Sequence, residues 1–236
     1  MIDAMKTLRK SESRGGADHG WLKARHSFSF AGYFDPRHMG FRSLRVINED
    51  RVAPGAGFPM HAHRDMEILT WMLAGELEHR DSLGNGSVIR VGELQYMCAG
   101  TGVRHSEFNH SNTAGVHLLQ IWILPDGPAR APRHEQRDFR LALARNDWIL
   151  LASGTGSEGS ITIHQDACVW ALKADDDLLR TRELGSRRGA WIQCARGSIE
   201  VQGTILSAGD ALCIEGEREI QFRGARESEI LYFDLA

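Results

Sequence analysis

The sequence is poor in cysteine, and none of its cysteines is paired in a motif. Its four cysteines, Cys98, Cys168, Cys194 and Cys213, lie far apart in 236 residues and form no CxxC pair. Isolated cysteines of this kind are typical of reduced thiols that are mostly buried in a core. We therefore expect no disulfide framework.

A basic stripe and a long apolar run are also missing. The formal net charge is −3 and the lysines and arginines are scattered, which argues against direct nucleic-acid binding. Residues 1–20 lack the apolar core of a signal peptide. No segment approaches the roughly 18 apolar residues of a membrane span. These absences predict a cytoplasmic protein with no membrane partner.

A long stretch with helical periodicity is absent as well. The chain instead breaks into short strand-like segments, such as FRSLRVIN, EILTWML and EILYFDL, separated by Gly, Asp and Asn turns. Turn signals every 8–12 residues or so are typical of an all-β sandwich or barrel. One short helical turn is expected near residues 132–140.

The two halves of the chain share a pattern. The Pro- and Gly-rich stretch 125–133 divides a longer N-terminal half from a shorter C-terminal half. Each half reads strand, Gly turn, strand, tight turn, strand, Gly-acid, strand, with Gly75 and Gly92-Glu93 in the first and Gly197 and Gly209-Asp210 in the second. This rhythm predicts two small antiparallel barrels.

Two short motifs carry the chemistry. His61 and His63 flank a single residue, and on a strand they would face the same side about 7 Å apart. His105 and Glu107 have the same spacing, one strand and one Gly-rich turn after Gly92. A small barrel could bring both pairs together, so that three imidazoles and one carboxylate converge. A pair of surface histidines in a loop is the alternative for His61 and His63 alone.

These motifs resemble those of the cupin family. The first cupin motif is similar to the run Gly55-x5-His61-x-His63-x3-Glu67-x7-Gly75. The second is similar to Gly92-x5-Cys98-x-Gly100-x4-His105-x3-Asn109, with Cys98 where cupins usually carry proline and two extra residues before the histidine. Among cupins, HAH followed by GTGVRHSE resembles the pirin family, and the likeness extends over residues 19–50 and 118–125.

The resemblance implies a bicupin, in which two jelly-roll barrels pack face to face with few short helices. We expect an N-terminal metal-binding barrel over residues 1–132 and a C-terminal, metal-free barrel over 133–236. The metal would be held by His61, His63, His105 and Glu107. Ordinary cupins take their carboxylate from the position of Glu67. Residues 61 to 67 would share one face on an unbroken strand, so strand parity leaves that alternative open.

The C-terminal half lacks the residues for a second such site. Transferring the offsets of the histidine motifs from Gly75 and Gly92 to Gly197 and Gly209 gives Glu183, Gly185, Phe222 and Gly224. No histidine follows His164. We therefore expect one metal per chain, in the N-terminal barrel.

Imidazole and carboxylate ligands suit several transition metals. Fe(II) is our first choice because chemistry with dioxygen needs a metal that shares electrons; Zn, Ni, Cu and Mn are the alternatives. The closest family likeness is to bacterial pirin-like quercetin 2,3-dioxygenases, which implies an oxidoreductase that opens a flavonol ring with O₂. In that reading Glu107 is a ligand, a catalytic base, or both.

Two further expectations concern the surroundings of the site and the rival function. The aromatic residues that could line a pocket for a planar ligand are Phe28, Phe30, Phe58, Tyr96 and Trp122. They could equally form part of the barrel core. The remaining histidines, His79, His134 and His164 among them, are expected at the surface or hydrogen-bonded in the core.

The alternative function, from pirins of other organisms, is a metal- or redox-dependent regulatory module that binds protein partners.

Overall fold

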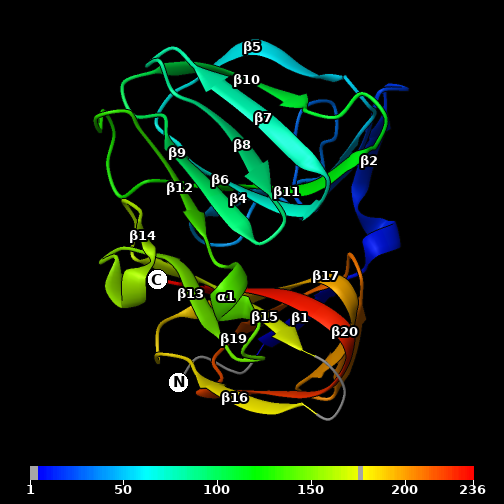
Figure 1. Ribbon diagram of the computed structural model, residues 1–236. Helices are drawn as coiled ribbons and strands as arrows, with labels where there is room; N and C mark the ends of the chain where they lie inside the picture. Colours follow the sequence, from blue (N-terminus) through cyan, green and yellow to red (C-terminus); the bar gives the residue numbers. More distant parts are fainter. Residues whose placement is uncertain (1–4, 175–177) are drawn as a thin grey trace. The chain divides into compact units, whose positions relative to one another are not determined.

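The computed structural model describes residues 5–174 and 178–236, and nearly all of their regular structure is β-strand (Figure 1). They form two compact units. We call residues 15–140 with 163–165 the N-terminal unit, and 141–162 with 166–236 and the described part of 1–14 the C-terminal unit. The all-β prediction is confirmed.

The sequence predicts an N-terminal barrel over residues 1–132 and a C-terminal barrel over 133–236, and these domain ranges stay predictions. The limits of the two compact units differ from them at two strands. Strand β1 (Met5–Arg9) pairs with β19 (Ala211–Glu215) and therefore belongs to the C-terminal unit. Strand β12 (Arg133–Asp138) pairs with β9 (Glu93–Cys98) and belongs to the N-terminal unit.

Helices are few and short in the described chain. They are α1 (Arg140–Leu143) and two 3-10 turns, η1 (Ser11–Ser13) and η2 (Ser157–Gly159). The helical turn predicted over residues 132–140 is wrong, because most of that segment is strand β12, hydrogen-bonded along the edge of β9. Sheet pairing at long range overrides the local pattern there. None of the described helices has the length and apolarity to cross a membrane.

Two sheets build the N-terminal unit, and they lie on its two sides in Figure 1. The seven-stranded sheet has the order β12, β9, β6 (Glu67–Ala74), β11 (Val116–Ile123), β4 (Leu44–Val52), β3 (Leu22–His26) and β2 (Gly15–Asp18). The four-stranded sheet has the order β5 (Gly57–His63), β10 (Val103–Asn109), β7 (Glu76–Asp81) and β8 (Gly86–Arg90).

One strongly bent, nine-stranded sheet builds the C-terminal unit. Its main path is β1, β19, β17 (Gly189–Val201), β20 (Glu219–Leu235), β15 (Ala167–Ala174), β13 (Ile149–Ser153) and β14 (Ile161–Thr162), with β18 (Thr204–Ser207) on β17 and β16 (Leu179–Glu183) on β20. None of the three sheets closes on itself among the described residues. The predicted barrels are therefore sheets with open edges.

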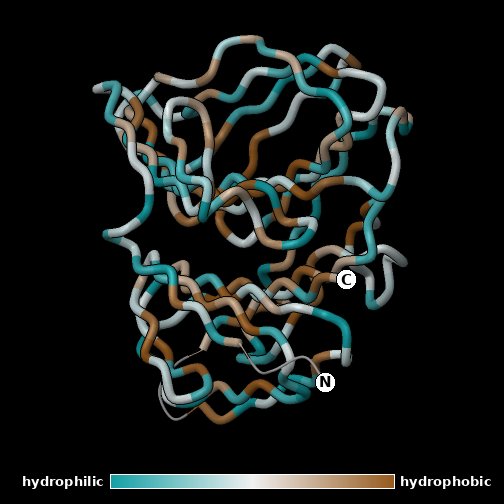
Figure 2. The backbone as a smooth tube through the Cα atoms, turned by 180° about the vertical axis from the view of Figure 1, so that it is seen from behind, coloured by the Kyte–Doolittle hydropathy of each residue, from teal (hydrophilic) through white to brown (hydrophobic). Residues whose placement is uncertain are grey.

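The apolar stretches of the chain run through the strands of each unit (Figure 2). In the C-terminal unit one large buried cluster includes Phe222, Tyr232 and Ile192. In the N-terminal unit strand β6 is buried along almost its whole length, with Leu69, Trp71 and Leu73 at 0–1% exposure. All four cysteines are free and three of them are buried, as predicted.

Candidate metal centre

Strands β5 and β10 bring the two histidine motifs together. The strands are antiparallel, and His61 lies directly opposite His105. Between His105 and Glu107 the pairing shifts, because β5 carries one extra residue: Glu107 is opposite Phe58. Such a bulge bends its strand and redirects side chains, and bulges are common beside active sites. All four predicted ligands thus come from one pair of strands in the four-stranded sheet.

The three histidines converge. The centroid of the His61 ring lies 4.4 Å from that of His105, and the His63 ring lies 4.8 Å from His61 and 4.9 Å from His105. Each ring offers a nitrogen within 4.8 Å of those of the other two. Three imidazoles this close form one wall of a coordination site.

Hydrogen bonds and burial prepare these rings for a metal. The Nδ1 of His61 lies 2.8 Å from the carbonyl oxygen of Pro59, within the bulge. A carbonyl only accepts, so Nδ1 is the donor, and Nε2 is the nitrogen left to face a metal. The Nε2 of His105 is buried and has no hydrogen-bond partner. Burial, followed by the neighbouring imidazoles, lowers the pKa of both His63 and His105 to about 3. Both rings are therefore neutral at pH 7, as metal ligands must be.

Glu107 extends the cluster inward. It is 3% exposed, and its carboxylate lies within 4.8 Å of ligand nitrogens of His105 and His79. Gln120 Nε2 donates to both carboxylate oxygens, at 2.9 and 3.2 Å, and the Thr70 hydroxyl lies 3.4 Å from one of them. Burial is the main cause that raises the pKa of Glu107. A divalent cation at the three histidines would offset that cost, so the donor set fits a metal.

A row of polar residues crosses the seven-stranded sheet opposite this cluster. Strand pairing aligns Gln136, Gln95, Thr70, Gln120, Asn48 and His26, one from each of six adjacent strands. The Thr70 hydroxyl donates to Gln120 Oε1 at 2.9 Å, which orients the Gln120 amide so that its NH₂ faces Glu107. The row therefore holds the carboxylate from the other sheet. Sequence reasoning missed it, because its members come from six different strands and only the register between those strands aligns them.

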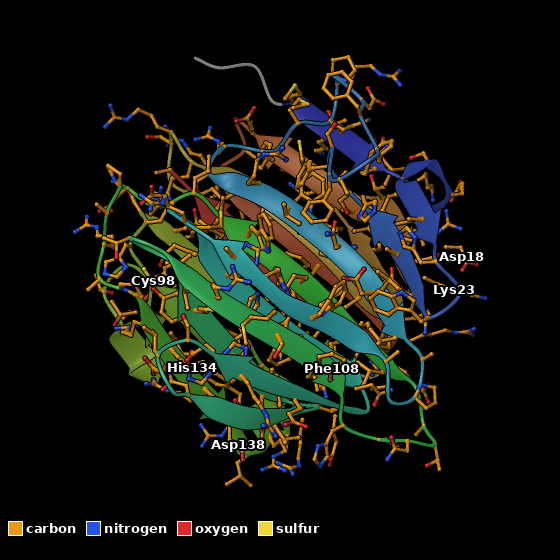
Figure 3. All side chains as sticks on the ribbon, turned by 90° about the horizontal axis from the view of Figure 1, so that it is seen from above. Asp18, Lys23, Cys98, Phe108, His134 and Asp138 are labelled. Atoms are coloured by element: carbon orange, nitrogen blue, oxygen red, sulfur yellow. The ribbon has the colours of Figure 1, made fainter. Side chains whose placement is uncertain are left out.

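His79 and His134 lie behind His105. The Nδ1 atoms of His79 and His105 are 3.4 Å apart, and His79 Nε2 lies 3.5 Å from Asp81 Oδ2. The His134 ring stacks on His79 at 4.9 Å and reaches Gln95, whose Nε2 is 3.1 Å from His134 Nε2. Figure 3 labels His134 in this part of the molecule. His79 was expected to be an ordinary core histidine, but it contacts a ring of the cluster directly.

The cluster opens onto a pocket of about 340 Å³. The predicted aromatic wall is confirmed for three residues, Phe30, Phe58 and Trp122, and the His63 ring packs edge-on to Trp122 at 4.9 Å. Phe28 is 2% exposed and is not among the lining residues. One further polar residue of the pocket was not foreseen. This is Asp50. Its burial and the nearby charge of Glu107 raise the pKa of Asp50 to about 7.

Glu67 lies elsewhere. Strand β5 ends at His63, Asp65 has a left-handed φ of 49°, and Glu67 begins strand β6 of the other sheet. The unbroken strand that would give residues 61 and 67 a common face does not exist. The Tyr96 hydroxyl donates to Glu67 Oε2 at 2.6 Å, so Tyr96 also turns away from the aromatic pocket.

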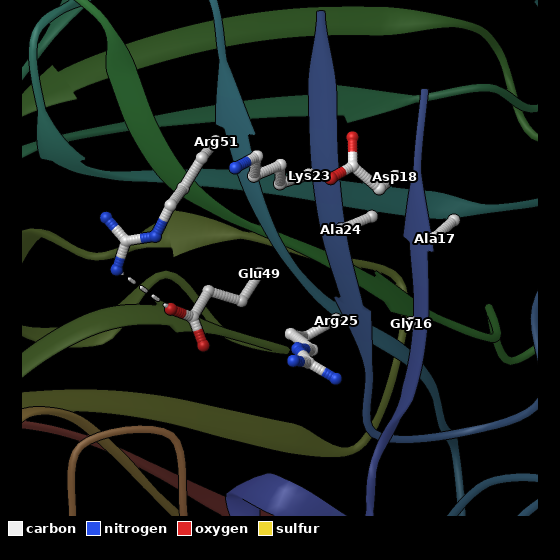
Figure 4. A pocket seen from close by; sticks show the side chains of 8 residues that line it. All are labelled: Gly16, Ala17, Asp18, Lys23, Ala24, Arg25, Glu49 and Arg51. Carbon is white, nitrogen blue, oxygen red and sulfur yellow. Dashed lines mark hydrogen bonds and ion pairs between the residues drawn. The ribbon is translucent and has the colours of Figure 1, made fainter. Parts of the chain in front are cut away.

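A second hollow lies over β2, β3 and β4 of the same unit (Figure 4). Its charged side chains are Asp18, Lys23, Arg25, Glu49 and Arg51. The Arg51 guanidinium pairs with Glu49 at 3.4 Å and is 59% exposed. No histidine or aromatic residue lines it. Its chemistry is that of a solvated sheet face, so the histidine cluster is the stronger candidate.

Comparison with known proteins agrees with this architecture. The family model Pirin matches residues 7–123, and the model for the quercetinase C-terminal cupin domain matches residues 150–235. The chain is 45% identical over 230 residues to a quercetin 2,3-dioxygenase of Escherichia coli K12, covering 97% of each chain. It belongs to the pirin family. Its two cupin domains are thereby established, and the resemblance predicted from the sequence is confirmed.

Solved structures extend the match. The crystal structure of YhhW from Escherichia coli superposes with a TM-score of 0.95 at 44% identity, covering 98% of each chain. The structure of this bacterial pirin in complex with nickel(II) gives a TM-score of 0.94 over 98% of this chain and 99% of that one. The nickel(II) ion bound by YhhW is consistent with the donor set described above for the present chain.

Proposed function

We propose that this pirin is a metal-dependent dioxygenase that opens the flavonol ring of quercetin-like substrates with O₂. Two observations carry the proposal: three imidazoles converge at the wall of an aromatic pocket, and a buried carboxylate lies beside one of them, His105. The names of its relatives point to the same substrate class. Pockets of roughly 300–1,000 Å³ are typical for small ligands, and about 340 Å³ suits a flat molecule of a few rings.

His61, His63, His105 and Glu107 would hold one divalent metal, for which we propose Fe(II). When bound, the metal would supply Lewis acidity toward the substrate oxygens and redox chemistry toward dioxygen. The nickel(II) complex of YhhW makes nickel the first alternative to test.

Protein groups around the metal would position the substrate and handle its proton. Phe30, Phe58 and Trp122 would sandwich the flat rings and exclude bulk water. Glu107 would accept the proton from the flavonol hydroxyl at a carboxylate oxygen, because burial has raised its pKa and so made it a better base. Gln120, which donates to both oxygens, would hold the carboxylate in place before and after the transfer.

Oxygen uptake tests this proposal. Protein loaded with Fe(II) or Ni(II) is mixed with quercetin in an oxygen electrode. Loss of the flavonol absorbance should accompany O₂ consumption and release of carbon monoxide. Metal-loaded protein that binds quercetin and consumes no O₂ would contradict the enzyme and favour the alternative, a regulatory module that binds a protein partner.

A further inference from the structure

A second group of metal-binding side chains lies away from the three histidines. Glu67 begins β6, and Cys98, which ends β9, lies directly opposite it. His164 joins them from the short segment 163–165, which belongs to the same compact unit. A carboxylate oxygen, a thiol sulfur and an imidazole nitrogen of these residues all lie within 4.8 Å of one another. Figure 3 labels Cys98.

Hydrogen bonds hold His164 in this group. Its carbonyl oxygen accepts from the Asp126 N–H at 2.7 Å, and its own N–H donates to Glu67 Oε2 at 2.9 Å. The next residue, Gln165, donates to the Leu124 carbonyl at 2.7 Å. The imidazole is therefore fixed beside the carboxylate by the backbone.

The Glu67 carboxylate is satisfied on one oxygen only. Glu67 is 0% exposed. The Tyr96 hydroxyl at 2.6 Å and the His164 N–H at 2.9 Å both donate to Oε2. Oε1 is buried without a partner at normal hydrogen-bond geometry and lies 3.5 Å from Nδ1 of His164, and the Cys98 thiol interacts with the same carboxylate. A buried carboxylate with an open oxygen is costly unless a cation or donor compensates it.

The three donors differ from those of the histidine cluster, because they include sulfur. Mixed thiolate, imidazole and carboxylate donors suit Zn²⁺ and exclude the oxygen-loving Mg²⁺ and Ca²⁺. We propose that Glu67, Cys98 and His164 form a second metal site of zinc type, with a solvent molecule as fourth ligand. The His164 side chain is 30% exposed, which gives the ion and that solvent molecule access.

Binding at this site includes a proton step. Burial, then the charge of Glu67, raises the pKa of Cys98 to about 12, so the thiol is protonated at neutral pH before a metal arrives. On binding, the S–H bond breaks, the sulfur–metal bond forms, and one proton per ion passes to solvent. This inference does not depend on the proposed dioxygenase activity, since it concerns other residues.

Cobalt(II) is the probe that distinguishes the two sites. Metal-free full-length protein is titrated with Co²⁺, followed by the near-ultraviolet thiolate-to-cobalt charge-transfer band. The histidine cluster contains no sulfur and cannot produce this band. We expect the band to stop growing once both sites are filled, at no more than two Co²⁺ per chain, and two equivalents of Zn²⁺ to abolish it. In the His61→Ala, His105→Ala double variant it should saturate at one.

Variants assign the band to these residues. Cys98→Ala should abolish it, and Glu67→Gln or His164→Ala should weaken cobalt binding at least about tenfold, because each removes one of three ligands. The matched control Cys168→Ala removes a cysteine of the other unit and should leave the band unchanged. The His61→Ala, His105→Ala double variant should also keep it, so that loss of dioxygenase activity and loss of this site are distinguishable.

Absence of a thiolate band in the wild type would overturn the proposal, as would a band that survives Cys98→Ala or disappears in Cys168→Ala. Circular dichroism identifies variants that fail to fold. Where Cys98→Ala fails, Glu67→Gln decides, because it is isosteric and keeps a carbonyl for Tyr96. Unchanged cobalt affinity in folded Glu67→Gln would contradict the site.

Discussion

The N-terminal and C-terminal units both contain antiparallel strand pairs, but the side chains on these strands differ. In the N-terminal unit β5 pairs with β10, and His61 faces His105. In the C-terminal unit β16 pairs with β20, and Phe222, which takes the place of His105 by its offset from the Gly-acid turn, lies opposite Arg180. Phe222 is 0% exposed and packs edge-on against Trp148 at 5.0 Å.

The difference shows what a site requires from its surroundings. Phe222 needs only apolar neighbours, whereas a buried histidine or carboxylate needs hydrogen-bond partners. The N-terminal unit supplies them from the opposite sheet, where Thr70 orients Gln120 and Gln120 holds Glu107. Both halves match cupin-type family models, but in the N-terminal unit the polar row would support the proposed metal.

The largest effect is expected from His63→Ala. It removes one of three converging imidazoles, so the content of iron or nickel and the turnover should fall to background together, whereas zinc held by Glu67, Cys98 and His164 should remain. Elemental analysis and oxygen uptake measure the two quantities. The control is His117→Ala, which breaks a half-buried pair with Glu49, 2.9 Å away, and should retain both. Full metal content in His63→Ala would refute the proposed ligand set.

Phe222→His tests whether one imidazole is enough to transfer the site. In the described part of the C-terminal unit Phe222 lies in an apolar cluster, so we expect no additional metal. Instead the variant should lose stability, by about 3–5 kcal/mol if the cost resembles that of removing a buried aromatic ring. Urea denaturation and elemental analysis provide the two readouts. A second tightly bound metal ion in this variant, absent from the wild type, would show that the polar surroundings matter less than proposed.

The two carboxylates can be ranked by Glu107→Gln and Glu67→Gln. Glu107→Gln should lower iron or nickel affinity and turnover about 10- to 100-fold or more, since it removes the charge held by Gln120. Glu67→Gln should leave both nearly unchanged, because Glu67 lies with Tyr96 and His164. Isothermal titration and steady-state kinetics give the ranking, and the reverse order would mean that this chain follows the general cupin pattern.

A smaller effect concerns acid stability of the metal-free protein. Burial lowers the pKa of His105 to about 3, against roughly 6.5 in the unfolded chain. Between these values the unfolded state binds more protons, so stability falls as the pH decreases. From pH 7 to pH 5.5 this one histidine should cost about 1 kcal/mol. Urea denaturation of wild type and His105→Gln at both pH values measures this cost. The prediction is contradicted if the two proteins lose the same free energy of unfolding between pH 7 and pH 5.5.

Sequence reasoning could propose as ligands those residues that lie close together in the chain. The spacing of His61 with His63, and of His105 with Glu107, encodes a common strand face, and the pairing of β5 with β10 then brings the two pairs together. The same spacing rule failed for Glu67, because Asp65 interrupts the strand. The i, i+2 spacing predicts which side chains share a face within one strand, but it does not predict at which residue the strand ends.

The missed residues share a physical cause. Gln120, His79 and His164 reach the two clusters from separate strands or segments, and none of them belongs to a local motif with the proposed ligands. Only the register between strands aligns them, and that register is set by tertiary packing rather than by local pattern. The prediction of a helical turn near residues 132–140 was wrong for the same reason, since residues 133–138 pair with β9 as a strand.

Anomalous diffraction from crystals grown with iron(II) or nickel(II) tests the central claim most directly. The anomalous difference map at the metal's absorption edge should show one strong peak per chain for that metal, within bonding distance of His61, His63, His105 and Glu107, and none in the C-terminal unit. A principal peak bound by Glu67 instead of Glu107, or one in the C-terminal unit, would contradict the account.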